Sequence, residues 1–444
     1  MNYAIRRPSD QELAAARRLT WEAFGTPTGR GRPGNGSSGS SGCGNTGGTA
    51  GTGDSSDTST STNSSTRGHA SDDGNEPPQG LDADGRPWPG PGFHTRGAFD
   101  GDRLLGQVMG REFHTWCQGV RIPTCGVAAV TIGAEHRGAG LIAPLMTDLL
   151  TDARDRGDVL ATLYATAPGI YHRFGFETVS AAETVTVPAT SAAAVRRGRP
   201  VQLRRAQAAD VPAVRRCYQQ WARKRTGALD RVPPSFSSTD EQLLARYDAI
   251  TLALDEDGTC LGYVCWDRGS LGSDVLRAQE FIACDEAAYR ALWRMLGSFS
   301  SVTPTIELRT CPGDSARVFL PTIHWAVSDD EPYMLRILDV PRALEARAGG
   351  RDVAVTFAVS GDECGLTEGT YRAESAGGRV QCSPADPRED APVLTVRGLS
   401  ALYAGILSAP DLLATGHLRG GSPEQQEALT ALLMHQPWQV HDEF

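Results

Sequence analysis

The sequence lacks the features that mark membrane, secreted and zinc-binding proteins. No run of about 18 apolar residues occurs, and the N-terminal segment has no apolar core of the kind found in signal peptides. The ten cysteines form no CxxC pair and have no histidine spacing typical of a zinc site. We therefore expect a cytoplasmic protein with no membrane span, no metal and reduced, mostly buried cysteines.

An excess of positive charge is also missing. The chain has 43 Lys and Arg residues against 53 Asp and Glu residues, which gives a formal net charge of −10. This balance argues against a nucleic-acid partner and suits a cationic substrate, although acidity also simply keeps a protein soluble. The net charge therefore argues against a nucleic-acid partner more firmly than it argues for a cationic substrate.

A long internal stretch lacks the side chains that build a hydrophobic core. Residues 26–80 contain no Val, Ile, Leu, Met, Phe, Trp or Tyr and are dominated by Gly, Ser, Thr, Asn, Asp and Pro. Such a segment buries too little apolar surface to offset the entropy lost on folding. We predict a disordered insertion over 26–91, with residues 86–91 as its Pro/Gly-rich end. An ordered substrate-binding loop is the alternative.

The rest of the chain alternates strand and helix patterns, which is typical of a mixed α/β protein. Its 444 residues are enough for roughly two to four domains. The N-terminal part predicts strand 5–7, a helix capped by Ser9 or Asp10, strands 97–99, 104–111 and 113–120, a strand at Val127, a helix from Leu141 and a parallel strand 159–164.

The most informative motif joins the Val127 strand to the Leu141 helix. The first N–H groups of a helix have no intrahelical partner, so a turn at this point can hold a phosphate. Gly138 and Gly140 would let that phosphate approach the backbone closely, and Pro144 falls where its missing N–H costs little. A P-loop needs Gly-Lys-Ser/Thr and a dinucleotide fold needs three glycines with a later acidic residue, and both are missing.

The same pattern occurs a second time without the glycine turn. Strand 4–7 and the helix with Arg17-Arg18 match strand 202–205 and the helix with Arg215-Arg216. Strands within 251–266 and at 275–283 and a helix at 286–296 follow, but Cys284-Asp285-Glu286 replaces the turn. Residues 268–272 contain two glycines, yet they lie between antiparallel strands, so we interpret them as a hairpin loop.

From about residue 341 the pattern changes once more. We predict strands 353–359, 369–373, 378–382 and 393–396, followed by helices that begin at Ser400 and Ser422. Ser422-Pro423-Glu424-Gln425 is a capping box, with Ser at the N-cap and Gln at the third helical position. A separate α/β unit therefore ends the chain.

Arg137-Gly138-Ala139-Gly140 after an apolar strand resembles the acetyl-CoA pyrophosphate site of the GNAT superfamily of N-acetyltransferases, although Ile142 stands where a small residue is usual. With the segment Gly-Ile-Tyr-His-Arg-Phe-Gly-Phe at 169–176, the altered second copy and the final Glu443-Phe444, the chain resembles the Eis (enhanced intracellular survival) acetyltransferases. The resemblance covers nearly everything outside 26–91. It implies an α/β (α+β) fold with an active GNAT domain over 1–190, a degenerate one over 197–340 and a sterol carrier protein-like domain over 341–444. It also implies a homohexamer built as a trimer of dimers.

The resemblance places the acetyl-CoA site on three segments. Strand residues would hydrogen-bond the pantetheine arm, turn amides would hold the diphosphate, and residues after the next strand would flank the thioester. The residues implied are Val130, Thr131, Ile132, Gly138, Ala139, Gly140, Leu141, Ile142, Ala143, Thr166 and Ala167. Any central strand needs residues such as Val130, so the turn is the more specific part of this assignment.

The resemblance also assigns the acid and the base. An ammonium must lose a proton before it can attack, and the departing thiolate needs an acid. Tyr171 resembles the family's acid, and a core tyrosine is the alternative. The base would be the C-terminal carboxylate of Phe444, which in another protein would be a frayed end. Its reference pKa of about 3.3–3.7 calls for proton transfer through water or for a pKa raised by burial. Glu443 would add negative charge that holds a polycationic acceptor.

One departure concerns the acceptor. Family members that acetylate aminoglycosides carry an acidic residue just past the first helix, where this chain has Phe24-Gly25-Thr26. Glu22, Asp82 and Asp84 are the candidates to replace it. We predict an acetyl-CoA-dependent N-acetyltransferase acting on a small-molecule amine such as an aminoglycoside, with protein or peptide lysines as a variant. The alternatives are an apolar-ligand carrier acting through the C-terminal domain and a non-catalytic acetyl-CoA sensor.

Overall fold

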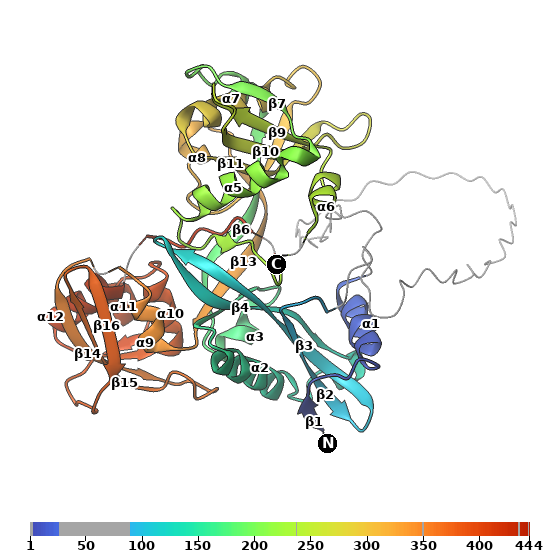
Figure 1. Ribbon diagram of the computed structural model, residues 1–444. Coiled ribbons are helices and arrows are strands. Elements are labelled where there is room, and N and C mark those ends of the chain that lie inside the picture. Colours follow the sequence, from blue (N-terminus) through green and yellow to red (C-terminus); the bar gives the residue numbers. More distant parts are fainter. Residues whose placement is uncertain (1–2, 26–88, 237, 349, 434–435, 443) are drawn as a thin grey trace, which may run out of the picture.

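The computed structural model describes residues 3–25, 89–236, 238–348, 350–433, 436–442 and 444. Most of the predicted disordered insertion, up to residue 88, lies outside these ranges, and so does Glu443, which is predicted to bind the acetyl acceptor. The described chain forms three lobes, and its C-terminus lies where they meet (Figure 1). The nine described cysteines are all free and seven of them are buried, as predicted.

The N-terminal lobe combines a twisted sheet with helices. Its elements are β1 (Ala4–Arg6), α1 (Leu13–Phe24), β2 (Phe93–Asp100), β3 (Arg103–Cys117), β4 (Val120–Ile132), the 3₁₀ helix η1 (Ala134–His136), α2 (Ile142–Arg156), β5 (Leu160–Tyr164), α3 (Pro168–His172), β6 (Glu177–Pro188) and α4 (Ala189–Ala193). The predicted helix after the glycine turn is confirmed as α2. The predicted parallel strand is confirmed as β5, which pairs in parallel with β4.

Two local predictions in this lobe are wrong. Strands 104–111 and 113–120 are one strand, β3, because the chain first reverses at Gln118 and Gly119, both with positive φ. Neither Ser9 nor Asp10 is the N-cap of α1, because the helix starts later, after Glu12. The Glu12 carboxylate instead accepts hydrogen bonds of 2.8 Å from the N–H and the hydroxyl of Ser9.

The second lobe repeats this order, which confirms the predicted repeat. Its elements are β7 (Gln202–Arg205), the 3₁₀ helix η2 (Ala208–Asp210), α5 (Val211–Ala222), β8 (Leu229–Asp230), α6 (Asp240–Ala245), β9 (Ala249–Leu254), β10 (Cys260–Asp267), β11 (Val275–Ala283), α7 (Glu286–Gly297), β12 (Thr305–Thr310), α8 (Ala316–Phe319) and β13 (Ala326–Ile337). Strands β10 and β11 are antiparallel, so residues 268–272 form the predicted hairpin connection.

A continuous sheet joins the two lobes. Strand β13, the last of the second lobe, lies between β5 and β6 of the first and pairs antiparallel with both. Strand β6 in turn extends into the second lobe and pairs with β12. The backbone order β4-β5-β13-β6-β12-β11 therefore passes from one lobe to the other without a break.

The C-terminal lobe is a small sheet covered by helices. Its elements are α9 (Val340–Glu345), β14 (Val353–Ser360), β15 (Gly369–Ala376), β16 (Arg379–Pro384), β17 (Val393–Thr395), α10 (Val396–Tyr403), α11 (Ala409–Ala414), β18 (Leu418–Arg419) and α12 (Pro423–Leu433). The predicted start of a helix at Ser400 is wrong, because Thr395 caps α10 by accepting a hydrogen bond from the Gly398 N–H. The predicted capping box at Ser422 is confirmed.

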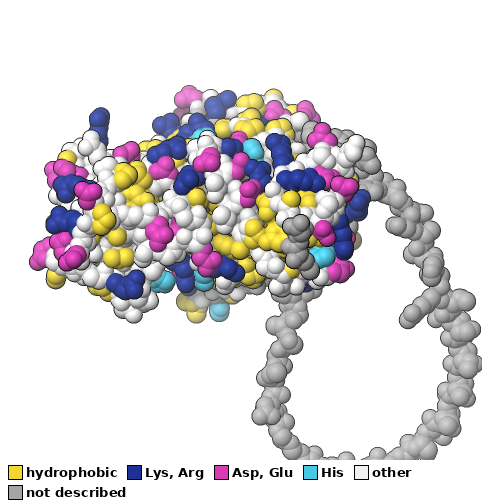
Figure 2. All heavy atoms as spheres, turned by 90° about the horizontal axis from the view of Figure 1, so that it is seen from below, with side chains coloured by type: hydrophobic (Ala, Val, Ile, Leu, Met, Phe, Trp, Pro, Cys, Tyr) yellow, Lys and Arg dark blue, Asp and Glu magenta, His cyan; other side chains and the backbone are white. Residues whose placement is uncertain are grey.

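The lobes share buried apolar surface as well as strands. Phe357 and Leu402 of the C-terminal lobe belong to the same buried cluster as Leu160 of β5 and Leu335 of β13. On the face drawn in Figure 2, acidic and basic side chains alternate and no extended basic patch stands out. After α12 the chain returns toward the junction of the lobes, where Trp438 and Val440 are buried.

Candidate active site

Strands β4 and β5 separate toward their C-terminal ends. Within the described residues they pair only over 124–126. A bulge then follows in β4, where Ala129 has a φ of 49° and the register against β3 shifts. The backbone of β4 beyond Gly126 is therefore an open edge on the β5 side, suited to an extended chain such as pantetheine. Val130, Thr131 and Ile132 occupy this stretch, and their hydrogen bonding to the acetyl-CoA arm stays a prediction.

The glycine turn opens onto the start of α2. Gly138 and Gly140 have φ values of 80° and 76°, which side chains rarely adopt, and a β-carbon at either would meet nothing within 4 Å. Leu141, just before the helix, makes no side-chain cap hydrogen bond. The positive end of the helix is thus left for an anion, and the predicted diphosphate site fits it. Ala139 lies in the exposed turn, and Ile142 and Ala143 form the start of α2.

Tyr171 lies on the short helix α3, beyond the end of β5. Its side chain is 8% exposed and packs edge-on against Phe176, with ring centroids 6.3 Å apart. Burial raises the pKa of the Tyr171 phenol above its usual value of 10. Thr166 and Ala167 are exposed at the preceding turn, between β5 and α3, and their contact with the thioester stays a prediction.

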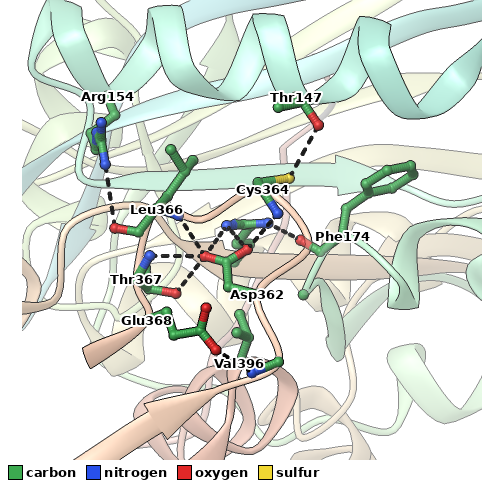
Figure 3. Close-up of polar contacts among 12 residues, drawn as sticks. Thr147, Arg154, Phe174, Asp362, Cys364, Leu366, Thr367, Glu368 and Val396 are labelled. Carbon is green, nitrogen blue, oxygen red and sulfur yellow. Dashed lines mark hydrogen bonds and ion pairs between the residues drawn. The ribbon is translucent and has the colours of Figure 1, made fainter. Parts of the chain in front are cut away.

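A buried ion pair holds the segment that follows Tyr171. The Arg336 guanidinium of β13 donates to the carbonyl oxygen of Phe174 and lies 2.8 Å from both carboxylate oxygens of Asp362. Both charged side chains are 0% exposed. Asp362 also accepts from the N–H and hydroxyl of Thr367, in a loop that lies beside α2 (Figure 3). The second and C-terminal lobes thus brace the Tyr171 segment, an arrangement that the sequence analysis missed.

Phe444 lies at the point where β4 and β5 separate. Its ring is 4.8 Å from that of Phe113 and 5.4 Å from that of Tyr164, between centroids. A β-carbon at Gly126 would come within 2.6 Å of the Phe444 ring, so only glycine leaves room for it there. No ring contact or hydrogen bond joins Tyr171 and Phe444 in the described part of the chain. The roles assigned to Tyr171 and Phe444 therefore stay predictions.

The second lobe has lost the open helix start. Asp285, just before α7, accepts a hydrogen bond of 2.8 Å from the Ala288 N–H, and Glu286 follows it. Aromatic rings line the pocket beside this helix, and Phe281 is stacked on Trp293 with ring centroids 4.8 Å apart. The predicted loss of phosphate binding in this copy therefore has a structural cause, because a carboxylate already occupies the helix start.

Known proteins share this arrangement of domains. Residues 75–179 and 227–337 each match the acetyltransferase (GNAT) domain family, and residues 340–439 match the sterol carrier protein domain family. An uncharacterized N-acetyltransferase of Streptomyces avermitilis is 31% identical over 378 residues, which cover 78% of this chain and 88% of that protein. N-acetyltransferase Eis of Mycobacterium tuberculosis is 27% identical, with 73% and 81% covered. This chain belongs to the Eis family of GNAT N-acetyltransferases.

The fold agrees with a solved Eis-family structure. Eis1 from Mycobacterium abscessus matches with a TM-score of 0.69 and 22% identity, with both chains fully covered. The predicted α/β fold, with two GNAT domains and a sterol carrier protein-like domain, is confirmed. As a member of the Eis family the chain is an N-acetyltransferase, and the GNAT fold implies acetyl-CoA as its co-substrate.

Two further findings concern the described ranges alone. None of their helices has the length and apolar character needed to cross a bilayer. Their His, Cys, Asp and Glu side chains form no group of three or more that could hold a metal ion.

Proposed function

We propose that this Eis-family enzyme transfers acetyl groups to amines of a polycationic acceptor such as an aminoglycoside, with Tyr171 as general acid and the Phe444 carboxylate as general base. The observation that carries the proposal is the position of Phe444. The last residue of the printed sequence lies over Gly126, where β4 and β5 part and the acetyl-CoA arm is expected to end. Acetyl-CoA supplies an activated thioester at this point.

The Phe444 carboxylate would take the proton of the acceptor ammonium. An ordinary terminal carboxyl, with a reference pKa of about 3.3–3.7, is a weak base for this step. The ring of Phe444 packs among the rings of Phe113, Tyr164 and Tyr333, and the proposal requires that these apolar surroundings desolvate the adjoining carboxylate enough to make it a stronger base. A water molecule between carboxylate and amine would serve the same purpose.

Tyr171 would supply the proton to the leaving thiolate. A phenol must be protonated to do so, and burial keeps the pKa of Tyr171 above 10. Below that pH the acid form dominates, so the group is ready throughout the neutral range. The thiol of CoA has a pKa near 8–9, so a hydrogen bond or a proton from the phenol stabilises the thiolate as it leaves.

The acceptor class rests on charge and on family membership. The net charge of −10 favours the approach of cations, and Glu443, outside the described residues, is the proposed local contact. Protein or peptide lysines are the variant within the same chemistry. We also propose cytoplasmic location and assembly as a homohexamer, a trimer of dimers, which native mass spectrometry would test.

The carrier alternative receives less support from the C-terminal domain. Among its described side chains, Phe357, Leu394, Leu402 and Leu433 are all 0% exposed and belong to one packed cluster. An apolar-ligand carrier would need room for its ligand among such side chains, so we favour the enzyme activity over the carrier alternative.

A panel of acceptors tests the proposed function. Acetyl-CoA is mixed with the full chain and with kanamycin, spermidine or a lysine peptide, and release of free CoA thiol is followed with a thiol reagent. We expect thiol release with at least one polycation, together with a mass gain of one acetyl group per modified amine. Acetyl-CoA binding without turnover on every acceptor would instead favour the sensor alternative.

A further inference from the structure

We propose that the second, degenerate acetyltransferase domain positions the catalytic end of the chain, and that Asp442 is the positioning residue through which it acts. The proposal rests on the proposed function, because it concerns where the Phe444 carboxylate is held. Asp442 touches neither the glycine turn nor Tyr171, so it is not itself a catalytic residue.

The carboxylate of Asp442 is enclosed by the second lobe. Its Oδ1 lies 2.5 Å from the Arg231 Nε and 2.8 Å from the Tyr218 hydroxyl. Its Oδ2 accepts a hydrogen bond of 2.9 Å from the Leu229 N–H. The residue is 1% exposed, so these contacts replace its hydration. A charge this well satisfied fixes the position of the backbone that carries it.

The guanidinium that holds Asp442 is itself held on its other side. The Arg231 Nη2 lies 2.6 Å from the Glu280 carboxylate of β11, which also accepts from the Tyr263 hydroxyl. Glu280 stands just past residue 278, the last residue of β11 that pairs with β12 in the described chain. The equivalent point in the first domain is the separation of β4 and β5. The second domain has therefore placed an anchor for the tail where the first keeps its reaction site.

Asp442 also contacts the first domain through its backbone. The Tyr164 hydroxyl of β5 donates a hydrogen bond to the Asp442 carbonyl oxygen, and the same Tyr164 ring packs against Phe444. One residue separates the anchored side chain from the terminal one. Two residues of chain span at most about 7 Å, so a fixed Asp442 leaves Phe444 a small range of positions.

The tail before Asp442 is guided by the same lobe. The Gln439 N–H donates to the Thr226 carbonyl at 2.8 Å, and the His441 ring meets Trp221 edge-on at 5.0 Å. Gly227, with a φ of 106°, would place a β-carbon 2.5 Å from the Gln439 carbonyl oxygen. The chain thus approaches the anchor along a path shaped by the second domain.

The main test compares Asp442→Asn with a matched control in the same lobe. Asp267 is 7% exposed and lines the same pocket as Arg231, but its hydrogen-bond donors, the Asp248 N–H and the Gln279 side chain, are not part of the tail, so Asp267→Asn is the control. We expect Asp442→Asn to lower kcat roughly 10- to 100-fold, as misplacement of a reacting group does, with the KM for acetyl-CoA unchanged. Asp267→Asn keeps the wild-type kcat.

A second readout reports the tail directly and does not depend on activity. Carboxypeptidase A is added to the native full-length proteins, and loss of the terminal Phe is followed by mass spectrometry. Asp442→Asn should lose Phe444 faster than wild type and the control. If all three proteins lose Phe444 at the same rate, Asp442 does not anchor the tail. Tyr218→Phe, which removes one hydroxyl and keeps the ring, is expected to give a smaller change in the same direction and serves if Asp442→Asn does not fold.

The outcomes separate this inference from the proposed function. If removal of Phe444 abolishes turnover and Asp442→Asn leaves kcat unchanged, Phe444 is supported as the general base and the positioning role of Asp442 is wrong. If removal of Phe444 leaves turnover intact, the proposed base falls, while the carboxypeptidase comparison still decides whether Asp442 anchors the tail. Recovery of most of the lost kcat in Arg231→Lys relative to Arg231→Met would support the charge contact.

Discussion

The two acetyltransferase domains share their element order but differ at the start of one helix. Helix α2 follows an exposed turn with two positive-φ glycines and no side-chain cap, whereas Asp285 caps α7 with its own carboxylate. A helix start that already holds a carboxylate has little potential left for a diphosphate. The same position in the two domains thus holds either an open glycine turn or an acidic cap, and only the open turn leaves the helix start free for the proposed diphosphate.

The domains also differ in what they do with the tail. The first receives the Phe444 ring over Gly126, and the second encloses the Asp442 side chain. On the proposals made above, one domain performs the reaction and the other aligns a group for it. Variants that change one domain and leave the other intact test this division of roles.

Removal of Phe444 should have the largest effect. Loss of a general base lowers kcat by roughly 10³-fold, within the range for acid–base catalysis. Steady-state kinetics with the best acceptor measure the loss, and calorimetric titration with acetyl-CoA should give the wild-type Kd. A turnover number within tenfold of wild type would show that the base lies elsewhere.

Tyr171→Phe should have the next largest effect. It removes the acid and keeps the ring that packs on Phe176, so we expect kcat to fall about 10²-fold. Because burial raises the pKa of Tyr171 above 10, the wild-type phenol is protonated below that pH and loses its proton as the pH rises through the raised value. The deficit of the variant should therefore be constant between pH 6 and 9, and a deficit that varies with pH in this window would contradict the assignment.

Gly140→Ala should weaken acetyl-CoA binding and leave kcat nearly intact. The φ of 76° costs a side chain roughly 1–2 kcal/mol, which is about a tenfold rise in the KM for acetyl-CoA if the turn must keep its shape. Gly258→Ala is the matched control, since Gly258 has a φ of 79° and equally open surroundings in the second domain. A similar rise of KM in both variants would mean that general destabilisation is responsible.

Asp285→Ala should have the smallest effect on catalysis. Loss of the cap costs about 1 kcal/mol of stability, measurable as a lower urea midpoint, because the Ala288 N–H loses its acceptor. Both kcat and the KM for acetyl-CoA should stay at wild-type values. A changed KM for acetyl-CoA would show that the second domain still takes part in cofactor binding.

Local features of the fold were predictable because neighbouring residues determine them. The glycine turn, the start of α2 and the altered Asp285 turn follow from which residues can adopt positive φ or cap a helix. The errors at β3 and α10 are also local. Glu112, a polar residue in the middle of β3, resembled a break, and Thr395 provided a better cap than any residue near Ser400.

Long-range features were not predictable from one sequence. Asp442 lies 224 positions from Tyr218, and Arg336 lies 162 positions from Phe174, so no local period connects them. Nothing in the composition marks which of the many charged residues become buried in pairs. The assignments of Tyr171 and Phe444 came from family resemblance, and the structure adds the surroundings in which those assignments can be tested.

Strand β13 has a consequence for any attempt to divide this enzyme. It fills the gap between β5 and β6 with hydrogen bonds to both, although it belongs to the second domain in sequence. An N-terminal fragment that ends between residues 190 and 197 would lack β13, and the edges of β5 and β6 that pair with it would be left unpaired. Unpaired strand edges promote aggregation. Strand β13 of the second acetyltransferase domain is thus part of the sheet of the first, and we expect either domain expressed alone to lose this pairing.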